Sequence, residues 1–219
     1  FGGIGSNVFN PALTGRAVLF ISFPTAMGAT WLAPKTISAV DAISSATVLS
    51  QIKADAFVVN SQSLLDLFIG NKAGCIGETS ILLILISFIF LLVTKIIDWR
   101  APIAMIFTVF ICTFIAGAIS ASSLQVGFEK GLLSLLTGGV MFGATFMVTD
   151  YATTPVTKPG RLIFGFGCGL ITFLIRQFGG YPEGVMFSIL IMNSIAPFLN
   201  NLTVRMYGYG RKKWVQKKI

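Results

Sequence analysis

Long apolar segments separated by short polar connections make up most of this chain. A helix that crosses the hydrocarbon core of a membrane needs about 20 apolar residues. Backbone groups in lipid must find partners within their own segment, which favours helices over open strands. The pattern therefore predicts an all-α, polytopic membrane protein with about six transmembrane helices. The predicted segments are 11–33, 80–97, 101–121, 131–148, 161–178 and 184–200.

The composition supports this prediction. The 219 residues are 54% hydrophobic and only 11% charged, whereas about a quarter of the residues in a soluble domain are charged. We interpret 1–219 as a single transmembrane domain. Because the chain begins at Phe1 without an initiator methionine, we expect it to be part of a longer protein.

The basic residues are unevenly distributed. The net charge is +8, and Arg205, Arg211, Lys212, Lys213, Lys217 and Lys218 all follow the last apolar segment. Positive residues flanking a transmembrane helix favour the cytoplasmic side. We therefore interpret 201–219 as a basic cytoplasmic tail and not as a nucleic-acid-binding tail. Alternation of the helices then places the long connection 34–79 outside.

Few residues suit catalysis or metal binding. The chain has no histidine, and Cys75, Cys112 and Cys168 lie far apart, so the sequence predicts neither a metal site nor a catalytic nucleophile with its base. Asp150 and Glu183 fall at the ends of apolar segments, where we expect hydrated capping. Glu78 lies in the external connection just before a segment, where the N-terminus of a helix favours an acid without any further function.

Glycine and proline mark several unusual places. Gly165 and Gly169 form a GxxxG spacing, which predicts close contact between helices. Residues 1–11, 179–184 and 193–201 combine glycine, asparagine or proline with apolar residues. Such interruptions are typical either of loop turns or of half-helices that meet at a binding site.

The external connection contains a run of small hydroxyl residues, DAISSATVLS at 41–50. Taken alone, it is typical of a capped loop, since Asp and Ser often cap short helices. It also resembles the Asp-x-x-Ser-x-Ala-Thr flavinylation motif of a family of membrane flavin subunits. That family includes the D subunit of Rnf ferredoxin:NAD oxidoreductases and the B subunit of sodium-pumping NADH:quinone oxidoreductases. The matching residues are Asp41, Ser44, Ala46 and Thr47.

Further motifs extend the resemblance over nearly the whole chain. Gly2 to Ala12 is similar to the family's GGxGxNxFNPA entry, and the family carries similar signatures at 77–80, 149–150 and 155–160. The GGYPEGV segment that begins at Gly179 points to the Rnf branch. Several motifs in the same order are more specific than any one of them.

The resemblance implies a fold, a function and cofactors. The fold would be part of a ten-helix, two-repeat structure similar to urea transporters. The function would be electron transfer across a bacterial or archaeal cytoplasmic membrane, coupled to Na⁺ or H⁺ export, with iron–sulfur and flavin subunits as partners. A separate flavin transferase would esterify FMN to Thr47, and riboflavin would bind near Asn7 and Asn10.

Two other interpretations remain open on the sequence. A small-molecule channel would explain the interrupted segments and the urea-transporter-like fold. A structural membrane anchor for an external redox partner would explain the apolar composition. Both predict a colourless protein, whereas the resemblance predicts bound flavin.

Overall fold

The computed structural model describes residues 7–28, 31–32, 44–45, 48–53, 61–75, 77–180 and 183–206. Nearly all of these residues are helical or connect helices. The only strands among them are β1 (Trp31–Leu32) and β2 (Ser44–Ser45), which form a short antiparallel pair. The helices are α1 (Pro11–Ser22), α2 (Pro24–Gly28), α3 (Val48–Lys53), α4 (Ser61–Ile69), α5 (Ile81–Val93), α6 (Arg100–Ala121), α7 (Leu124–Leu136), α8 (Val140–Phe142), the π-helix η1 (Gly143–Met147), α9 (Lys158–Phe178) and α10 (Val185–Met206).

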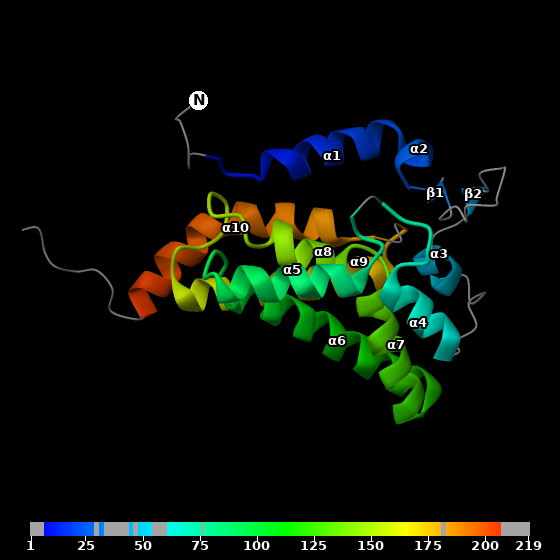
Figure 1. Cartoon of the computed structure of the whole chain (residues 1–219). Coiled ribbons are helices and arrows are strands. Elements are labelled where there is room, and N and C mark those ends of the chain that lie inside the picture. Colours follow the sequence, from blue (N-terminus) through cyan, green and yellow to red (C-terminus); the bar gives the residue numbers. More distant parts are fainter. Residues whose placement is uncertain are drawn as a thin grey trace, which may run out of the picture.

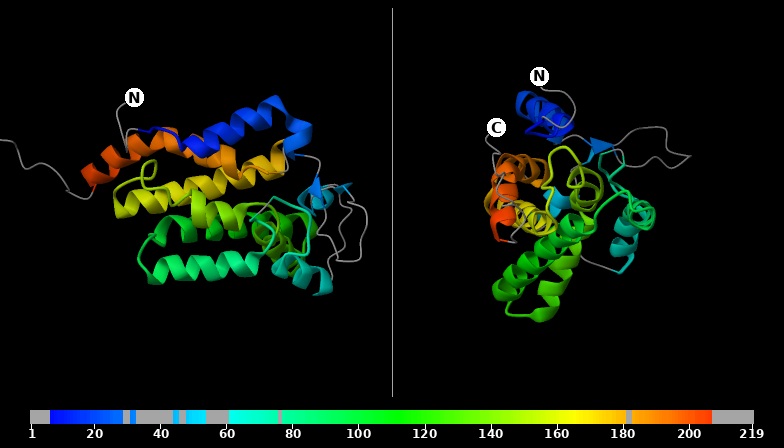
Figure 2. Two further views of the ribbon diagram at one scale, coloured as in Figure 1. Left: turned by 45° about the horizontal axis from the view of Figure 1, so that its top comes forward. Right: turned by 90° about the vertical axis from the view of Figure 1, so that its left-hand side faces the viewer.

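The longer helices lie side by side and alternate in direction (Figure 1). At one end of the bundle α1, α6 and α9 begin and α5 and α10 end; we call this the tail end. At the other end lie α2, the two strands, α3 and α4 (Figure 2); we call this the loop end. The predicted alternation of the segments is therefore present in the structure, with 48–53 and 61–69 at the end opposite the end of α10.

The predicted number of six spans is not confirmed. Three helices, α6, α9 and α10, are long and apolar enough to cross a membrane, and a fourth span results if the bent pair formed by α7 and 140–147 is counted. The helices α1 and α5 are apolar but shorter, with 12 and 13 residues. At 1.5 Å per residue each is about 20 Å long, less than the roughly 30 Å of a hydrocarbon core.

Local chemistry explains why these two helices stop early. Pro24 lacks a backbone N–H and restricts the residue before it, and Phe23 leaves the helical region with φ −132° and ψ 63°. The segment predicted as 11–33 is thus divided between α1 and α2. Helix α5 ends at Val93 with Thr94 as its C-cap, and Lys95 follows with a left-handed φ of 55°.

The segment predicted as one span at 131–148 is broken in the structure. Helix α7 starts earlier, at Leu124, ends at Leu136 and is followed by α8 and η1 at a bend of 62°. By contrast, 193–201, which the sequence marked as an interruption, lies inside the continuous helix α10 although it contains Pro197. Neither a loop turn nor a pair of half-helices is therefore present at 193–201, and the broken helix lies in a segment that the sequence predicted as one span.

The core lies between α6, α9, α10 and the short helices after the break. Met105, Val109, Val140, Phe164 and Ile189 are fully buried there. The GxxxG prediction is confirmed, because a Cβ added at Gly169 would lie 2.8 Å from the carbonyl oxygen of Met105, and one added at Gly165 would overlap that of Ala101. The two glycines let the backbones of α9 and α6 touch.

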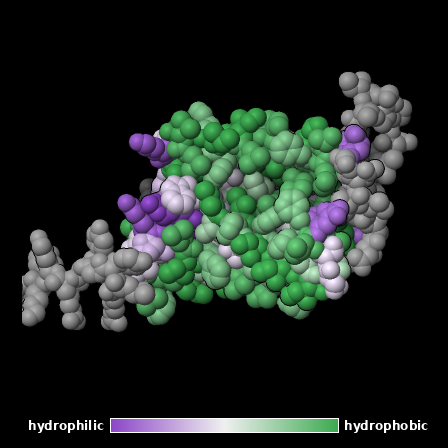
Figure 3. Space-filling model, turned by 90° about the horizontal axis from the view of Figure 1, so that it is seen from below, coloured by the Kyte–Doolittle hydropathy of each residue, from purple (hydrophilic) through white to green (hydrophobic). Residues whose placement is uncertain are grey.

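The surface between the two ends is apolar. Seen from below, the side chains form a broad hydrophobic band, with hydrophilic residues gathered toward the two ends (Figure 3). Large side chains on this surface include those of Phe90, Phe107 and Ile119, which are more than half exposed. Such a band is typical of a protein whose sides face lipid.

Candidate functional site

The structure describes the predicted flavinylation motif only in part. Asp41, Ala46 and Thr47 lie outside the described residues, and Ser44 lies in β2, opposite Leu32. Helix α3 begins at Val48, directly after the motif.

Helix α3 packs against the loop end of the bundle. Val48 and Ile52 contact the apolar cluster that contains Leu67, Leu136 and Met141. A Cβ added at Gly138 would lie 3.1 Å from Cδ2 of Leu49. The residues that follow the motif therefore lie against the break between α7 and α8.

Two cations lie at the carboxyl end of α7. Gly138 adopts a φ of +64°, which ends the helix there. Arg176 of α9 donates to the carbonyl oxygens of Ser134 at 2.7 Å and Thr137 at 3.2 Å. The ammonium group of Lys72 donates to the carbonyl oxygen of Leu136 at 2.5 Å. These are carbonyls that a helix leaves without partners, and the helix dipole favours positive charge beside them.

Two carboxylates lie beside Gly139, at the start of α8. Glu183 accepts a hydrogen bond from the N–H of Gly139 at 2.6 Å and forms an ion pair with Arg16 of α1 at 3.5 Å. Glu78 accepts from the N–H of Cys75 at 3.2 Å. A Cβ added at Gly139 would lie 2.5 Å from Oε1 of Glu183 and 3.0 Å from Oε2 of Glu78, so only glycine leaves room for both carboxylates.

We call this set of five ionisable residues the break cluster: Arg16, Lys72, Glu78, Arg176 and Glu183. Its charges are partly removed from water. Burial raises the pKa of Glu78, and the negative charge of Glu183 raises it further. Burial also lowers the pKa of Lys72 to about 8, although Glu78 opposes this shift. Both shifts favour the neutral forms, because burial penalises charge. The cluster thus places two carboxylates and three basic side chains around the break between α7 and α8.

Glu78 lies before α5, as the sequence indicated, but it is buried and does not cap that helix. Only 9% of its surface is exposed, and the N-cap of α5 is Ser80, whose hydroxyl accepts from the N–H of Leu83 at 3.4 Å. Glu183 is not a simple cap either, since it joins Gly139 to Arg16. Arg16 carries the sequence signal that could have indicated the cluster, because a charge inside an apolar segment needs a partner.

Asp150 does cap a turn, at the tail end of the bundle. Its carboxylate accepts from the N–H of Ala152 at 3.3 Å and from the hydroxyl of Thr153 at 2.9 Å. Asn10 is joined to it, since Nδ2 of Asn10 donates to Asp150 at 3.3 Å. This contact links the start of α1 to the segment before α9.

The two asparagines predicted to bind riboflavin differ in their surroundings. The Oδ1 atom of Asn10 accepts from the N–H groups of Ala12 and Leu13 at 3.0 and 3.2 Å, so this side chain caps α1. One N–H of its amide remains after the bond to Asp150. Asn7 is exposed, and the described part of the chain offers it no hydrogen-bond partner. One N–H of Asn10 and the amide of Asn7 thus remain to bind the polar edge of a ligand, while the oxygen of Asn10 is already used.

Cys75 provides a chemical test of the break cluster. Burial and the carboxylate of Glu78 raise the pKa of its thiol to about 12, and the thiolate is the reactive form. We expect iodoacetamide at pH 8 to alkylate Cys75 at least about 100-fold more slowly than an unperturbed thiol, whose pKa is about 8.5. Peptide mass spectrometry would separate this reaction from those of Cys112 and Cys168.

The matched variants are Glu78→Gln and Asp66→Asn. Each removes one negative charge at the loop end, but only Glu78 contacts Cys75. Alkylation should become faster in Glu78→Gln and stay unchanged in Asp66→Asn. Equal rates in the two variants would contradict the described contact.

Comparison with known proteins gives a consistent result. Residues 1–208 match the NQR2, RnfD, RnfE family. The chain is 42% identical to the D subunit of the Na⁺-translocating ferredoxin:NAD⁺ oxidoreductase complex of Acetobacterium woodii, over 97% of this chain and 63% of that protein. It is 40% identical to the D subunit of the proton-translocating ferredoxin:NAD⁺ oxidoreductase complex of Clostridium ljungdahlii, over 92% of this chain and 61% of that protein.

A relative from the other branch is also similar. The B subunit of the Na⁺-translocating NADH-quinone reductase of Chromohalobacter salexigens is 36% identical over 94% of this chain and 50% of its own length. The chain thus spans about three fifths of the two D subunits and half of this B subunit. The match over residues 1–208 shows that the chain belongs to the NQR2, RnfD, RnfE family.

Proposed function

We propose that this chain is part of the flavin-carrying membrane subunit of an ion-translocating ferredoxin:NAD oxidoreductase of the Rnf type. The observation that carries the proposal is the complete motif Asp41, Ser44, Ala46 and Thr47 in a chain similar to the D subunits of two such complexes. The subunit relays electrons across the membrane, and this transfer is coupled to export of Na⁺ or H⁺. In this role it is a component of a translocase and holds no NAD site of its own.

The proposed attachment point is the hydroxyl of Thr47. A separate flavin transferase forms a phosphoester between this oxygen and FMN, so the chain needs no activating base beside the threonine. The small side chains of Ser45 and Ala46 leave space for that enzyme. Bound flavin would supply one- and two-electron chemistry, while the protein supplies position and electrostatics.

The surroundings of α3 support a cofactor tethered at the loop end. A phosphodiester carries a negative charge, and the break cluster beside α3 contains three cations and two carboxylates. Three basic residues against two acidic ones give the cluster a formal charge of about +1, counted from the usual charges of these side chains. Helix α3 begins directly after Thr47 in the sequence and is packed against the bundle at both Val48 and Ile52.

The remaining parts of the proposal follow from the family resemblance. Riboflavin binds non-covalently near Asn7 and Asn10, at the tail end. Partner subunits with iron–sulfur clusters and flavins deliver and accept electrons. The loop end with Thr47 faces outward from a bacterial or archaeal cytoplasmic membrane, and the tail 201–219 faces the cytoplasm. The two-repeat, ten-helix fold includes helices that precede Phe1.

Peptide mass spectrometry of the subunit, purified with its complex and denatured, tests the proposal. The peptide with Thr47 should carry the added mass of FMN less water, and Thr47→Val should lose all of it. Thr36→Val removes a hydroxyl from the same connection and should keep the flavin. An unmodified wild-type peptide from cells with an active transferase would refute the covalent FMN.

Two alternatives have supporting observations. Similarity to the B subunit of a NADH-quinone reductase favours a sodium-pumping NADH:quinone oxidoreductase, which would differ by reducing quinone in the purified complex. The 62° bend after α7 favours a channel, because broken helices often line transport sites. A channel would be colourless and would pass a small solute in liposomes.

A further inference from the structure

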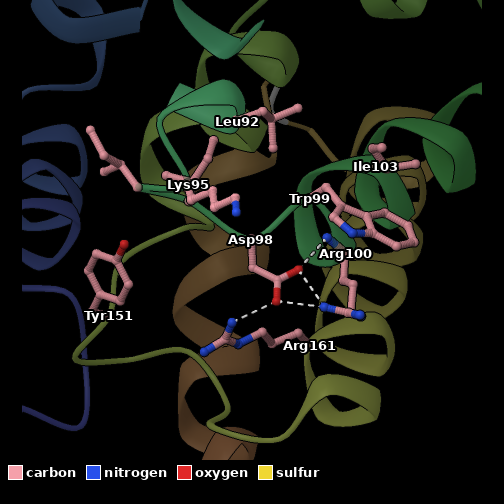
Figure 4. A pocket seen from close by; sticks show the side chains of 10 residues that line it. Leu92, Lys95, Asp98, Trp99, Arg100, Ile103, Tyr151 and Arg161 are labelled. Atoms are coloured by element: carbon pink, nitrogen blue, oxygen red, sulfur yellow. Dashed lines mark hydrogen bonds and ion pairs between the residues drawn. The ribbon is translucent and has the colours of Figure 1, made fainter. Parts of the chain in front are cut away.

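A pocket of about 580 Å³ opens at the tail end of the bundle, on the side of α5 and α6. Its walls come from the end of α5, the connection 94–99, the start of α6, and two residues farther along the chain, Tyr151 and Arg161. Figure 4 shows these side chains around the carboxylate of Asp98. None of the pocket's residues belongs to the flavinylation motif or to the break cluster.

The rim of the pocket carries more positive than negative charge. It contains Lys95, Arg100 and Arg161 and a single acid, Asp98. Asp98 forms salt bridges with Arg100 at 2.9 Å and with Arg161 at 2.8 Å. Burial raises the pKa of Asp98, but hydrogen bonds from the backbone of Arg100 and from the two guanidinium groups outweigh this and lower it. The rim therefore keeps a charge of about +2 at neutral pH.

The three cations have N–H donors that the described hydrogen bonds do not use. In Arg161, Nη1 donates to the carboxylate of Asp98 and Nε donates to the carbonyl oxygen of Pro155. A guanidinium has five N–H donors, so donors remain on both arginines. The amine of Lys95 points toward Asp98 (Figure 4) and forms no salt bridge within the described part of the chain. Fixed arginines beside an unpaired lysine are suited to a phosphate group.

The other side of the pocket is apolar and faces the hydrophobic band. Leu92, Ile96 and Ile103 line it, and both isoleucines are over 40% exposed. Trp99 and Tyr151 border it, with Arg100 stacked 5.1 Å above the ring of Trp99. Aromatic side chains of this kind concentrate where membrane meets water. The pocket thus combines a cationic rim with an apolar wall that is partly exposed.

We propose that this pocket binds an anionic phospholipid, with the lipid phosphate at Lys95, Arg100 and Arg161 and an acyl chain along Leu92, Ile96 and Ile103. A free phosphate would use only the cationic rim and leave the apolar wall uncovered. Basic pockets between transmembrane helices bind acidic headgroups in this way. The site lies at the end of the bundle where α10 ends, so it takes lipid from the leaflet on that side.

The test uses the full-length protein purified in detergent with its complex. Native mass spectrometry would measure retention of phosphatidylglycerol, with phosphatidylcholine as the zwitterionic comparison. We expect wild type to prefer phosphatidylglycerol and Lys95→Gln to reduce that preference about fivefold, the equivalent of about 1 kcal/mol for one basic residue near a membrane surface. Lys95→Arg keeps the charge and should keep the preference.

Lys158→Gln is the matched control. Lys158 is exposed in the first turn of α9 and does not line the pocket, so this variant should bind like wild type. An equal loss in Lys158→Gln would show a general surface-charge effect and overturn the site. If inorganic phosphate displaced the lipid from wild type, the pocket would be a free-anion site. Lys95→Arg keeps the positive charge, so a loss of the lipid preference in this variant would also overturn the assignment. This holds even if Lys95→Gln lowered the thermal midpoint.

Discussion

Gly165→Val is expected to destabilise the helix bundle strongly. A Cβ at this position overlaps the carbonyl oxygen of Ala101, so the obstacle is backbone that cannot rotate away. Insertion of carbon atoms into a well-packed core costs about 1–3 kcal/mol and sometimes more, and valine adds three carbons here. We expect a loss of at least about 3 kcal/mol in the free energy of unfolding.

The thermal midpoint of the purified protein measures this effect. For a chain of this size, 3 kcal/mol corresponds to a fall of about 6–12 °C. The control is Gly15→Ala in α1, because no atom lies within 4 Å of a Cβ added there. Alanine favours an exposed helix over glycine by up to about 1 kcal/mol, so the midpoint should hold or rise. Equal falls in both variants would contradict the close contact of α6 and α9.

Arg176→Met is expected to have the second large effect. The variant leaves the carbonyls of Ser134 and Thr137 without their donor. It also removes one of the cations that face Glu78 and Glu183. A buried acceptor left without its donor costs about 1–3 kcal/mol, and two carbonyls lose their donor here, so we expect a loss of about 2–6 kcal/mol in the free energy of unfolding. Lys158→Met, in the first turn of the same helix, removes an exposed cation and should change the midpoint little.

A double variant separates the two causes of that loss. Glu78→Gln in the Arg176→Met background removes a carboxylate that the first substitution leaves with less compensation. We expect it to restore about 1–2 kcal/mol relative to the sum of the single effects, a coupling typical of residues in one network. Strictly additive effects would mean that Arg176 acts only through the two carbonyls. Thermal midpoints of the four proteins complete the cycle.

The apolar pattern predicted helices well but predicted their limits poorly. Each of the six predicted segments contains a helix, since length and hydropathy alone require internal backbone pairing in lipid. Pro24 and the turn after Thr94 shorten two of them, and these are local effects that hydropathy does not record. The continuous α10 shows the reverse case, because Pro197 suggests a break that packing against α9 and η1 overrides.

Some candidate residues form a local sequence pattern, whereas others come together only in the fold. The motif around Thr47 is a local pattern, so the sequence indicated it without any structure. The break cluster joins residues 16, 72, 78, 176 and 183, which no local pattern connects. Glycines were predicted to allow tight packing, and this holds for Gly165 and Gly169. At Gly138 and Gly139 their role is different: one ends a helix at positive φ, and the other leaves room for two carboxylates.

Composition and local patterns were enough to indicate a helical membrane protein with a stretch that resembles a flavinylation motif, because these properties depend on residues close together along the chain. The position of the broken helix and the charges buried beside it emerge only in the folded arrangement. The physical reason is that burying a charge is unfavourable unless partners lie within a few ångströms. Those partners come from α1, α9 and the connections around them, and folding alone brings them together.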